Sequence, residues 1–165
     1  MSDLVPKLRV LAVDDEFVIA STWAQILRMS GFDADWATSG EEAIRRARQR
    51  CPDVLLTDVM MQGINGVETA AEILNFHPGC RVILISGHAE TAHALSVSHP
   101  GHLRFEILRK PIHPLVLLER IRESIQPLDR TRIPACAQSE LTTPDAALNS
   151  TIYPPPAAEH SALIR

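Results

Sequence analysis

The chain lacks the features that mark several classes of protein. Its 165 residues include 16 Lys and Arg against 20 Asp and Glu, for a formal net charge of -4. A nucleic-acid-binding surface needs a strong excess of basic residues on one face. No apolar run is long enough to form the core of a signal peptide or to span a bilayer. We therefore expect a cytoplasmic protein that binds neither nucleic acid nor a membrane.

Cysteine is scarce, and internal repeats and heptads are absent. The three cysteines, Cys51, Cys80 and Cys136, are widely spaced. Their odd number and spacing favour isolated reduced thiols over a disulfide framework or a zinc knuckle. The length of the chain predicts a single domain with a real core.

Five apolar runs alternate with segments whose apolar residues recur at helical spacing. We predict strands at residues 8–13, 34–37, 54–57, 81–85 and 105–108, and helices at residues 18–29, 39–50, 67–76, 89–97 and 114–125. Ser39 and Glu42 match a capping box at the start of the second helix. This alternation predicts an α/β fold in which helices cover both faces of a parallel sheet.

The composition changes at residue 127. Six of the chain's 12 prolines lie from Pro127 onward, with Ala, Ser and Thr between them. Such a segment buries too little apolar surface to offset the entropy lost on ordering. We therefore expect one domain over residues 8–126, followed by a disordered Pro/Ala-rich tail over residues 127–165.

Residues capable of chemistry stand where the apolar runs end. They are Asp14, Asp15, Asp58, Ser86 and Lys110. Open parallel sheets collect ligands at the carboxyl ends of their strands. These residues, although distant in sequence, are therefore expected to meet in one pocket.

The residue types in this pocket point to phosphate chemistry. Three carboxylates repel one another, and a hard divalent cation such as Mg²⁺ relieves that repulsion while also binding a phosphoryl oxygen. Lys110 and Ser86 supply an ammonium group and a hydroxyl donor for other phosphoryl oxygens. Asp58 is the lone acid at its strand end, so we predict that it is the nucleophile and forms an aspartyl phosphate.

Four segments of the sequence closely resemble the receiver domain of bacterial two-component response regulators, the CheY-like superfamily. They cover residues 10–16, 53–68, 85–89 and 109–111. The resemblance implies a flavodoxin-like, doubly wound sheet of five parallel strands in the order 2-1-3-4-5.

The resemblance also implies a metal site. Asp15 and Asp58 would bind Mg²⁺ directly, Asp14 would help through water, and the backbone carbonyl of Met60 would complete the ligand set.

A phosphoacceptor site is implied beside this metal. Asp58 would take a phosphoryl group from a phosphohistidine on a histidine kinase or a histidine phosphotransfer protein. Ser86 would swing toward that group and Lys110 would bridge to it, with a cis peptide bond between Lys110 and Pro111.

By the same resemblance, the chain is expected to be a stand-alone receiver in a phosphorelay, and a phosphoacceptor rather than a dedicated enzyme. It would signal to a target protein through the face formed by the fourth helix, fifth strand and fifth helix. A homodimer is an open alternative.

The sequence departs from the family pattern at two places. Gln62 stands where the family usually has proline, and Ile107 stands where it usually has an aromatic switch residue, with Phe105 two residues earlier. Gln62 should alter the stiffness of its loop without touching the reacting groups, and Ile107 implies that another rearrangement replaces rotation of an aromatic ring in signalling. A separate alternative keeps the fold but discards phosphorylation, leaving a degenerate interaction module.

Two rival activities fit the sequence less well. An FMN carrier would need a Ser/Thr-rich phosphate loop after the first strand, where this chain has Asp14, Asp15 and Glu16. A phosphatase using an aspartyl-phosphate intermediate typically needs a second acid at the position of Met60.

Overall fold

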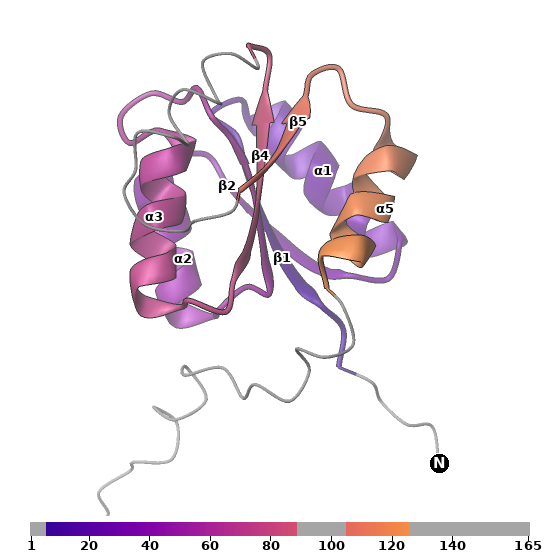
Figure 1. The fold of residues 1–165 in the computed structure, drawn as a ribbon, viewed down its shortest axis with the longest axis horizontal. Coiled ribbons are helices and arrows are strands. Elements are labelled where there is room, and N and C mark those ends of the chain that lie inside the picture. The colour runs from indigo at the N-terminus through magenta and orange to yellow at the C-terminus, as the bar shows by residue number, and fades with distance from the viewer. Residues whose placement is uncertain (1–5, 89–104, 126–165) are drawn as a thin grey trace, which may run out of the picture.

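The computed structural model describes residues 6–88 and 105–125 (Figure 1). The strands are β1 (Arg9–Val13), β2 (Asp33–Ala37), β3 (Val54–Asp58), β4 (Arg81–Ser86) and β5 (Glu106–Arg109). The helices are α1 (Phe17–Met29), α2 (Gly40–Gln49), α3 (Gly66–Phe76) and α5 (Pro114–Ser124). The helix predicted at residues 89–97 and the tail predicted at residues 127–165 lie outside the described residues. None of the described helices is long and apolar enough to cross a membrane.

The five strands form one parallel sheet in the order β2-β1-β3-β4-β5. This confirms the predicted α/β, doubly wound fold. Helices α1 and α5 cover one face of the sheet, and α2 and α3 cover the other (Figure 1). Because the sheet lies between two helical layers, β3 and most of β1 and β4 are buried on both faces, which explains their continuous apolar sequence.

Each face of the sheet has its own core. Leu11 and Val13 point toward α2 and α3, whereas Val10 and Ala12 point toward α1 and α5. This follows from the period of two along a strand, which sends successive side chains to opposite faces. The two cores fix the sheet, and with it the edge at which all the strands end.

The capping box predicted at Ser39 and Glu42 is confirmed in part. The Ser39 side chain accepts a hydrogen bond from the Glu42 backbone N–H, as predicted. The Glu42 carboxylate, however, accepts from the Thr38 N–H at 3.0 Å, so the capping box is not reciprocal. A complete capping box instead joins Asn65 and Glu68 at the start of α3, which sequence reasoning missed.

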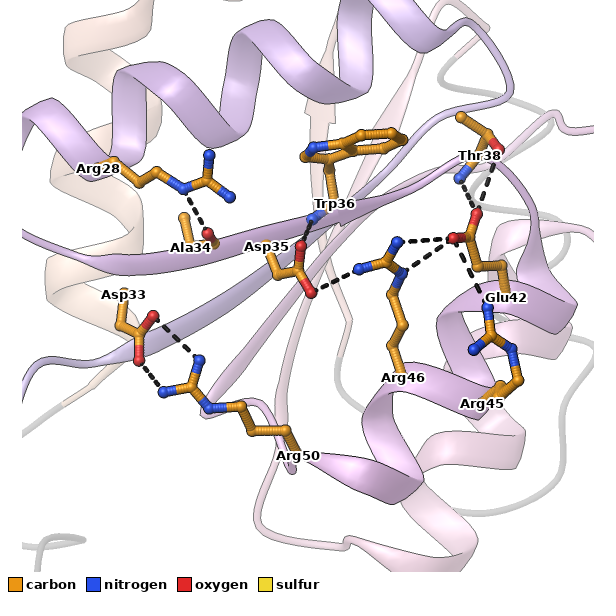
Figure 2. A network of polar contacts seen from close by, with 10 residues as sticks. All are labelled: Arg28, Asp33, Ala34, Asp35, Trp36, Thr38, Glu42, Arg45, Arg46 and Arg50. Atoms are coloured by element: carbon orange, nitrogen blue, oxygen red, sulfur yellow. Dashed lines mark hydrogen bonds and ion pairs between the residues drawn. The ribbon is translucent and has the colours of Figure 1, made fainter.

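Helix α2 is joined to the edge strand β2 by charged side chains (Figure 2). The Arg46 guanidinium donates to Asp35 at 2.7 Å and to Glu42 at 2.8 Å, and it lies 5.6 Å from the centre of the Trp36 ring. Arg50 pairs with Asp33. The pairs with Asp35 and Asp33 hold β2 to Arg46 of α2 and to Arg50 just after it. They also place charge along the edge strand, where it discourages pairing with another chain.

The prediction that the cysteines are isolated reduced thiols holds for one of the two that the structure describes. Cys80 is a free, buried thiol, and burial raises its pKa to about 12. Cys51 is disulfide-bonded, so the prediction of reduced thiols is wrong for this residue. The number and spacing of cysteines do not show which of them form disulfide bonds, so the sequence could not predict this bond.

Candidate functional site

The predicted site residues lie at the carboxyl edge of the sheet. Asp14 follows β1, Asp58 ends β3, Ser86 ends β4, and Lys110 follows β5. The strands are in register there, because Asp58 pairs with Ile85 in the neighbouring strand. The sequence argument that these strand ends meet is therefore confirmed.

Three carboxylates converge at this edge. One oxygen each from Asp14, Asp15 and Asp58 lies within 4.8 Å of the other two. Asp14 and Asp58 are buried, whereas Asp15 is exposed. This donor set, made of oxygen alone and open to water on one side, suits a small hard cation that keeps part of its hydration shell. The residues therefore fit Mg²⁺.

Met60 lies in the loop that leaves β3 at the same edge, two residues after Asp58. Its side chain is exposed, so it is not part of either core. The predicted role of its backbone carbonyl as a metal ligand stays a prediction.

Lys110 joins two of the acids. Its Nζ atom lies 3.1 Å from Asp14 Oδ2 and 3.4 Å from Asp58 Oδ2. The peptide bond between Lys110 and Pro111 is cis, as predicted. Burial acts to lower the pKa of Lys110, but the hydrogen bond to Asp14 and the charges of both acids outweigh it, so that pKa is raised. Lys110 is therefore held as a cation.

The surroundings of Asp58 disfavour the ionised form of its carboxyl group. Burial raises the pKa of Asp58, and the nearby charge of Asp14 raises it further, while Lys110 opposes both effects without cancelling them. The ionised carboxylate is thus less stable than its solvent-exposed counterpart. A bound cation would favour the ionised form, which is the form that can attack phosphorus.

Ser86 is near the acids but its hydroxyl is engaged elsewhere. The side chain is fully buried. Its Oγ donates to the His88 carbonyl at 2.9 Å and accepts from the His88 N–H at 3.0 Å. Ser86 must therefore release His88 before it can donate to a group bound at Asp58.

Two backbone contacts at the site were missed by sequence reasoning. The Gln62 N–H donates to Asp15 Oδ2 at 3.3 Å. Gly66 packs so closely on β3 that a Cβ there would lie 2.0 Å from the Asp58 carbonyl oxygen. The presence of glycine at position 66 was the available signal for the second contact. The signal for the first was Gln62 in place of the family's usual proline, because any residue except proline carries an N–H.

The comparisons with known sequences agree on the family. The model of the response regulator receiver domain matches residues 10–122. Chemotaxis protein CheY of Thermotoga maritima is 28% identical over 116 residues, which are 70% of this chain and 95% of that protein. DNA-binding response regulator MtrA of Mycolicibacterium paratuberculosis is 27% identical over 118 residues. The chain spans about half the length of MtrA and the similar curated regulators that it matches.

Solved structures agree as well. A CheY-like receiver domain protein from Methanospirillum hungatei has a TM-score of 0.64 at 25% identity, covering 72% of this chain and 93% of that one. Response regulator protein TrrA from Thermotoga maritima, solved in complex with Mg²⁺-BeF, has a TM-score of 0.62 at 27% identity and covers 72% of this chain and 99% of that one. This chain therefore belongs to the response regulator receiver family of two-component signalling proteins.

Proposed function

We propose that the chain accepts a phosphoryl group on Asp58, in a Mg²⁺-dependent reaction, from a phosphohistidine on a histidine kinase or a histidine phosphotransfer protein. One observation carries the proposal. The Lys110 ammonium lies 3.1 Å from Asp14 and 3.4 Å from Asp58, beside the point where the three carboxylates converge. This combines a nucleophile, a place for a metal and a cation for a phosphoryl oxygen.

The metal would be held directly by carboxylate oxygens of Asp15 and Asp58 and by the Met60 backbone carbonyl, and Asp14 would bind it through water. When bound, Mg²⁺ would neutralise the acids and bind a phosphoryl oxygen. The related TrrA was solved with Mg²⁺-BeF, which supports the assignment of this ion to the present chain.

In the proposed transfer, a carboxylate oxygen of Asp58 attacks the phosphorus atom. The oxygen–phosphorus bond forms as the phosphorus–nitrogen bond of the donor breaks, and the electron pair of that bond stays on the imidazole nitrogen. Lys110 pairs with one phosphoryl oxygen, and the Ser86 hydroxyl leaves His88 to donate to another. The chain is a phosphoacceptor, not an enzyme that turns over many substrate molecules.

An apolar cleft beside Lys110 supports docking of a protein donor. The cleft has a volume of about 400 Å³ and is lined by Ile19, Trp23, Ile85, Lys110, Pro111 and Ile112. Phe17 and Val18, which directly precede Ile19 at the start of α1, are also exposed apolar side chains. A donor that packs on this face would bring its phosphohistidine close to Asp58. The signal would then leave through protein–protein contacts that include β5 and α5.

The test is intact-mass analysis after incubation with acetyl phosphate and Mg²⁺. Wild type should gain one phosphoryl group, and Asp58→Asn should gain none. Asp53→Asn is a matched control, because Asp53 precedes β3 at the opposite edge of the sheet, where its carboxylate accepts from the Arg9 N–H at 2.7 Å. This control should be phosphorylated like wild type.

Two outcomes would contradict the proposal. A phosphoryl adduct on Asp58→Asn would place the acceptor elsewhere. No adduct on wild type would favour the alternative function, an interaction module that works without phosphorylation.

A further inference from the structure

The three acids at the site are restrained very unequally. Asp14 Oδ1 accepts from the Glu16 N–H at 3.0 Å, and its Oδ2 contacts Lys110. Asp58 also contacts Lys110. Asp15 is exposed, and its one hydrogen bond within the described residues comes from the Gln62 backbone N–H at 3.3 Å. The position of the Asp15 carboxylate therefore depends on this bond.

The loop that carries Gln62 is itself held in place. Its ends are closed by a hydrogen bond from the Gly66 N–H to the Val59 carbonyl at 3.1 Å. Its middle packs on the first turn of α2, where a Cβ on Gly63 would lie 3.0 Å from Glu41 Oε1. The Gln62 N–H is thus presented to Asp15 by backbone that is anchored on both sides.

We infer that the Gln62 backbone N–H positions the Asp15 carboxylate for metal binding and couples the loop between β3 and α3 to occupancy of the metal site. The inference rests on the proposed Mg²⁺ site. The bond engages Oδ2 and leaves Oδ1 without a hydrogen bond among the described residues. A carboxylate held in this way loses less rotational freedom when it binds a cation, so binding is favoured.

The group that acts is the backbone and not the side chain. The Gln62 side chain is exposed and forms no hydrogen bond within the described residues. Any residue with an N–H would serve at this position, and proline would not. Thermodynamic linkage requires the converse effect: a metal that fixes Asp15 also stabilises the Gln62 loop.

The first test is a Mg²⁺ titration of the full chain by isothermal titration calorimetry. Gln62→Pro removes the donor and should weaken binding roughly three- to tenfold. This is less than the 10–100-fold or so expected for partners of buried metal ligands, because Asp15 is exposed and the bond is long. Gln62→Ala keeps the N–H and should bind within about twofold of wild type. Urea unfolding checks that both variants are folded.

The second test reads the bond itself and does not need a proline variant. Without metal, the Gln62 amide should exchange its hydrogen faster in Asp15→Ala than in wild type, as measured by NMR. Glu16→Ala is the control, because no hydrogen bond within the described residues joins the Glu16 carboxylate to Gln62. It should leave that exchange rate unchanged.

The outcomes separate the inference from the function on which it rests. Equal Mg²⁺ affinity in Gln62→Pro and Gln62→Ala, or a Gln62 exchange rate that ignores Asp15→Ala, would overturn the inference alone. Failure of wild type to bind Mg²⁺ would overturn the proposed metal site, and the inference with it.

Discussion

The closest packing at the site lies between two backbone segments, and it gives a sharp prediction. A Cβ on Gly66 would lie 2.0 Å from the Asp58 carbonyl oxygen and 3.0 Å from Thr57 Oγ1. Non-bonded carbon and oxygen atoms rarely approach within about 3 Å, so Gly66→Ala must move the end of β3 or the start of α3 by roughly 1 Å. Both segments are buried, so neither can move without repacking.

The expected loss of stability follows from that displacement. Overpacking a tight site typically costs about 1–3 kcal/mol. Alanine has a helix propensity better than that of glycine by up to about 1 kcal/mol, but Gly66 is the first residue of α3, where this gain is small. We expect a net destabilisation of about 2 kcal/mol, which lowers the urea midpoint by roughly 1 M for a slope near 2 kcal/mol/M. Mg²⁺ binding should weaken as well, because Asp58 moves with its strand.

The assay is urea unfolding followed by circular dichroism. Gly79→Ala is the matched control, because the nearest atom to a Cβ there is His77 Cε1 at 3.8 Å, an ordinary contact. It should change stability by no more than about 0.5 kcal/mol. If Gly66→Ala and Gly79→Ala unfold at the same urea concentration, the close approach of Gly66 to Asp58 is refuted.

Three further predictions follow from charged and titratable groups. Burial lowers the pKa of His77 from 6.5. The unfolded chain therefore binds a proton at His77 more readily than the folded chain does, and stability should fall as the pH drops below about 6.5. His77→Gln should abolish this part of the pH dependence in urea titrations between about pH 5 and 7, and an unchanged profile would contradict the reasoning. Arg46→Met should destabilise the protein by about 1–2 kcal/mol, because it removes two ion pairs and the contact with the Trp36 ring. Arg45 is exposed and lies 3.8 Å from Glu42, so Arg45→Met should change stability by less than about 0.5 kcal/mol. Equal effects of the two substitutions on the urea midpoint would be evidence against a stabilising role for the Arg46 contacts. Asp58→Asn should raise the melting temperature of the metal-free protein, because the raised pKa of Asp58 shows that its ionised form is disfavoured in the fold. Mg²⁺ should then raise the melting temperature of wild type more than that of the variant. A metal-free variant that melts below metal-free wild type would contradict this prediction.

The sheet was predictable because burial on both faces leaves a simple signal. Runs such as Val54–Thr57 and Arg81–Ile85 are apolar at nearly every position, and β3 and β4 follow them closely. The edge strand β2 gave a weaker signal, because Asp33 and Asp35 interrupt its apolar sequence and pair with Arg50 and Arg46. The prediction therefore began at Ala34 and missed the first residue of β2.

The site was predictable only to the level of which residues meet. Parallel strand order brings Asp14, Asp58 and Lys110 together, whatever the loops do. Contacts made by loop backbone carry little residue-type signal, so the bonds between Ser86 and His88 could not be predicted. Gln62 in place of the family's proline showed that an N–H was available, but not that it donates to Asp15. These contacts depend on the conformation of each loop and not on its composition.

The hydrogen bonds also bear on how the acids would divide the work of holding a metal. Both oxygens of Asp14 are already engaged, one by the Glu16 N–H at 3.0 Å and the other by Lys110 at 3.1 Å. Direct coordination by Asp14 would have to displace one of these donors, whereas a metal-bound water could share an oxygen with them. Asp15 keeps one oxygen without a hydrogen bond among the described residues. Direct ligation by Asp15 and ligation through water by Asp14 thus require the least rearrangement, which is the arrangement that the family resemblance implied.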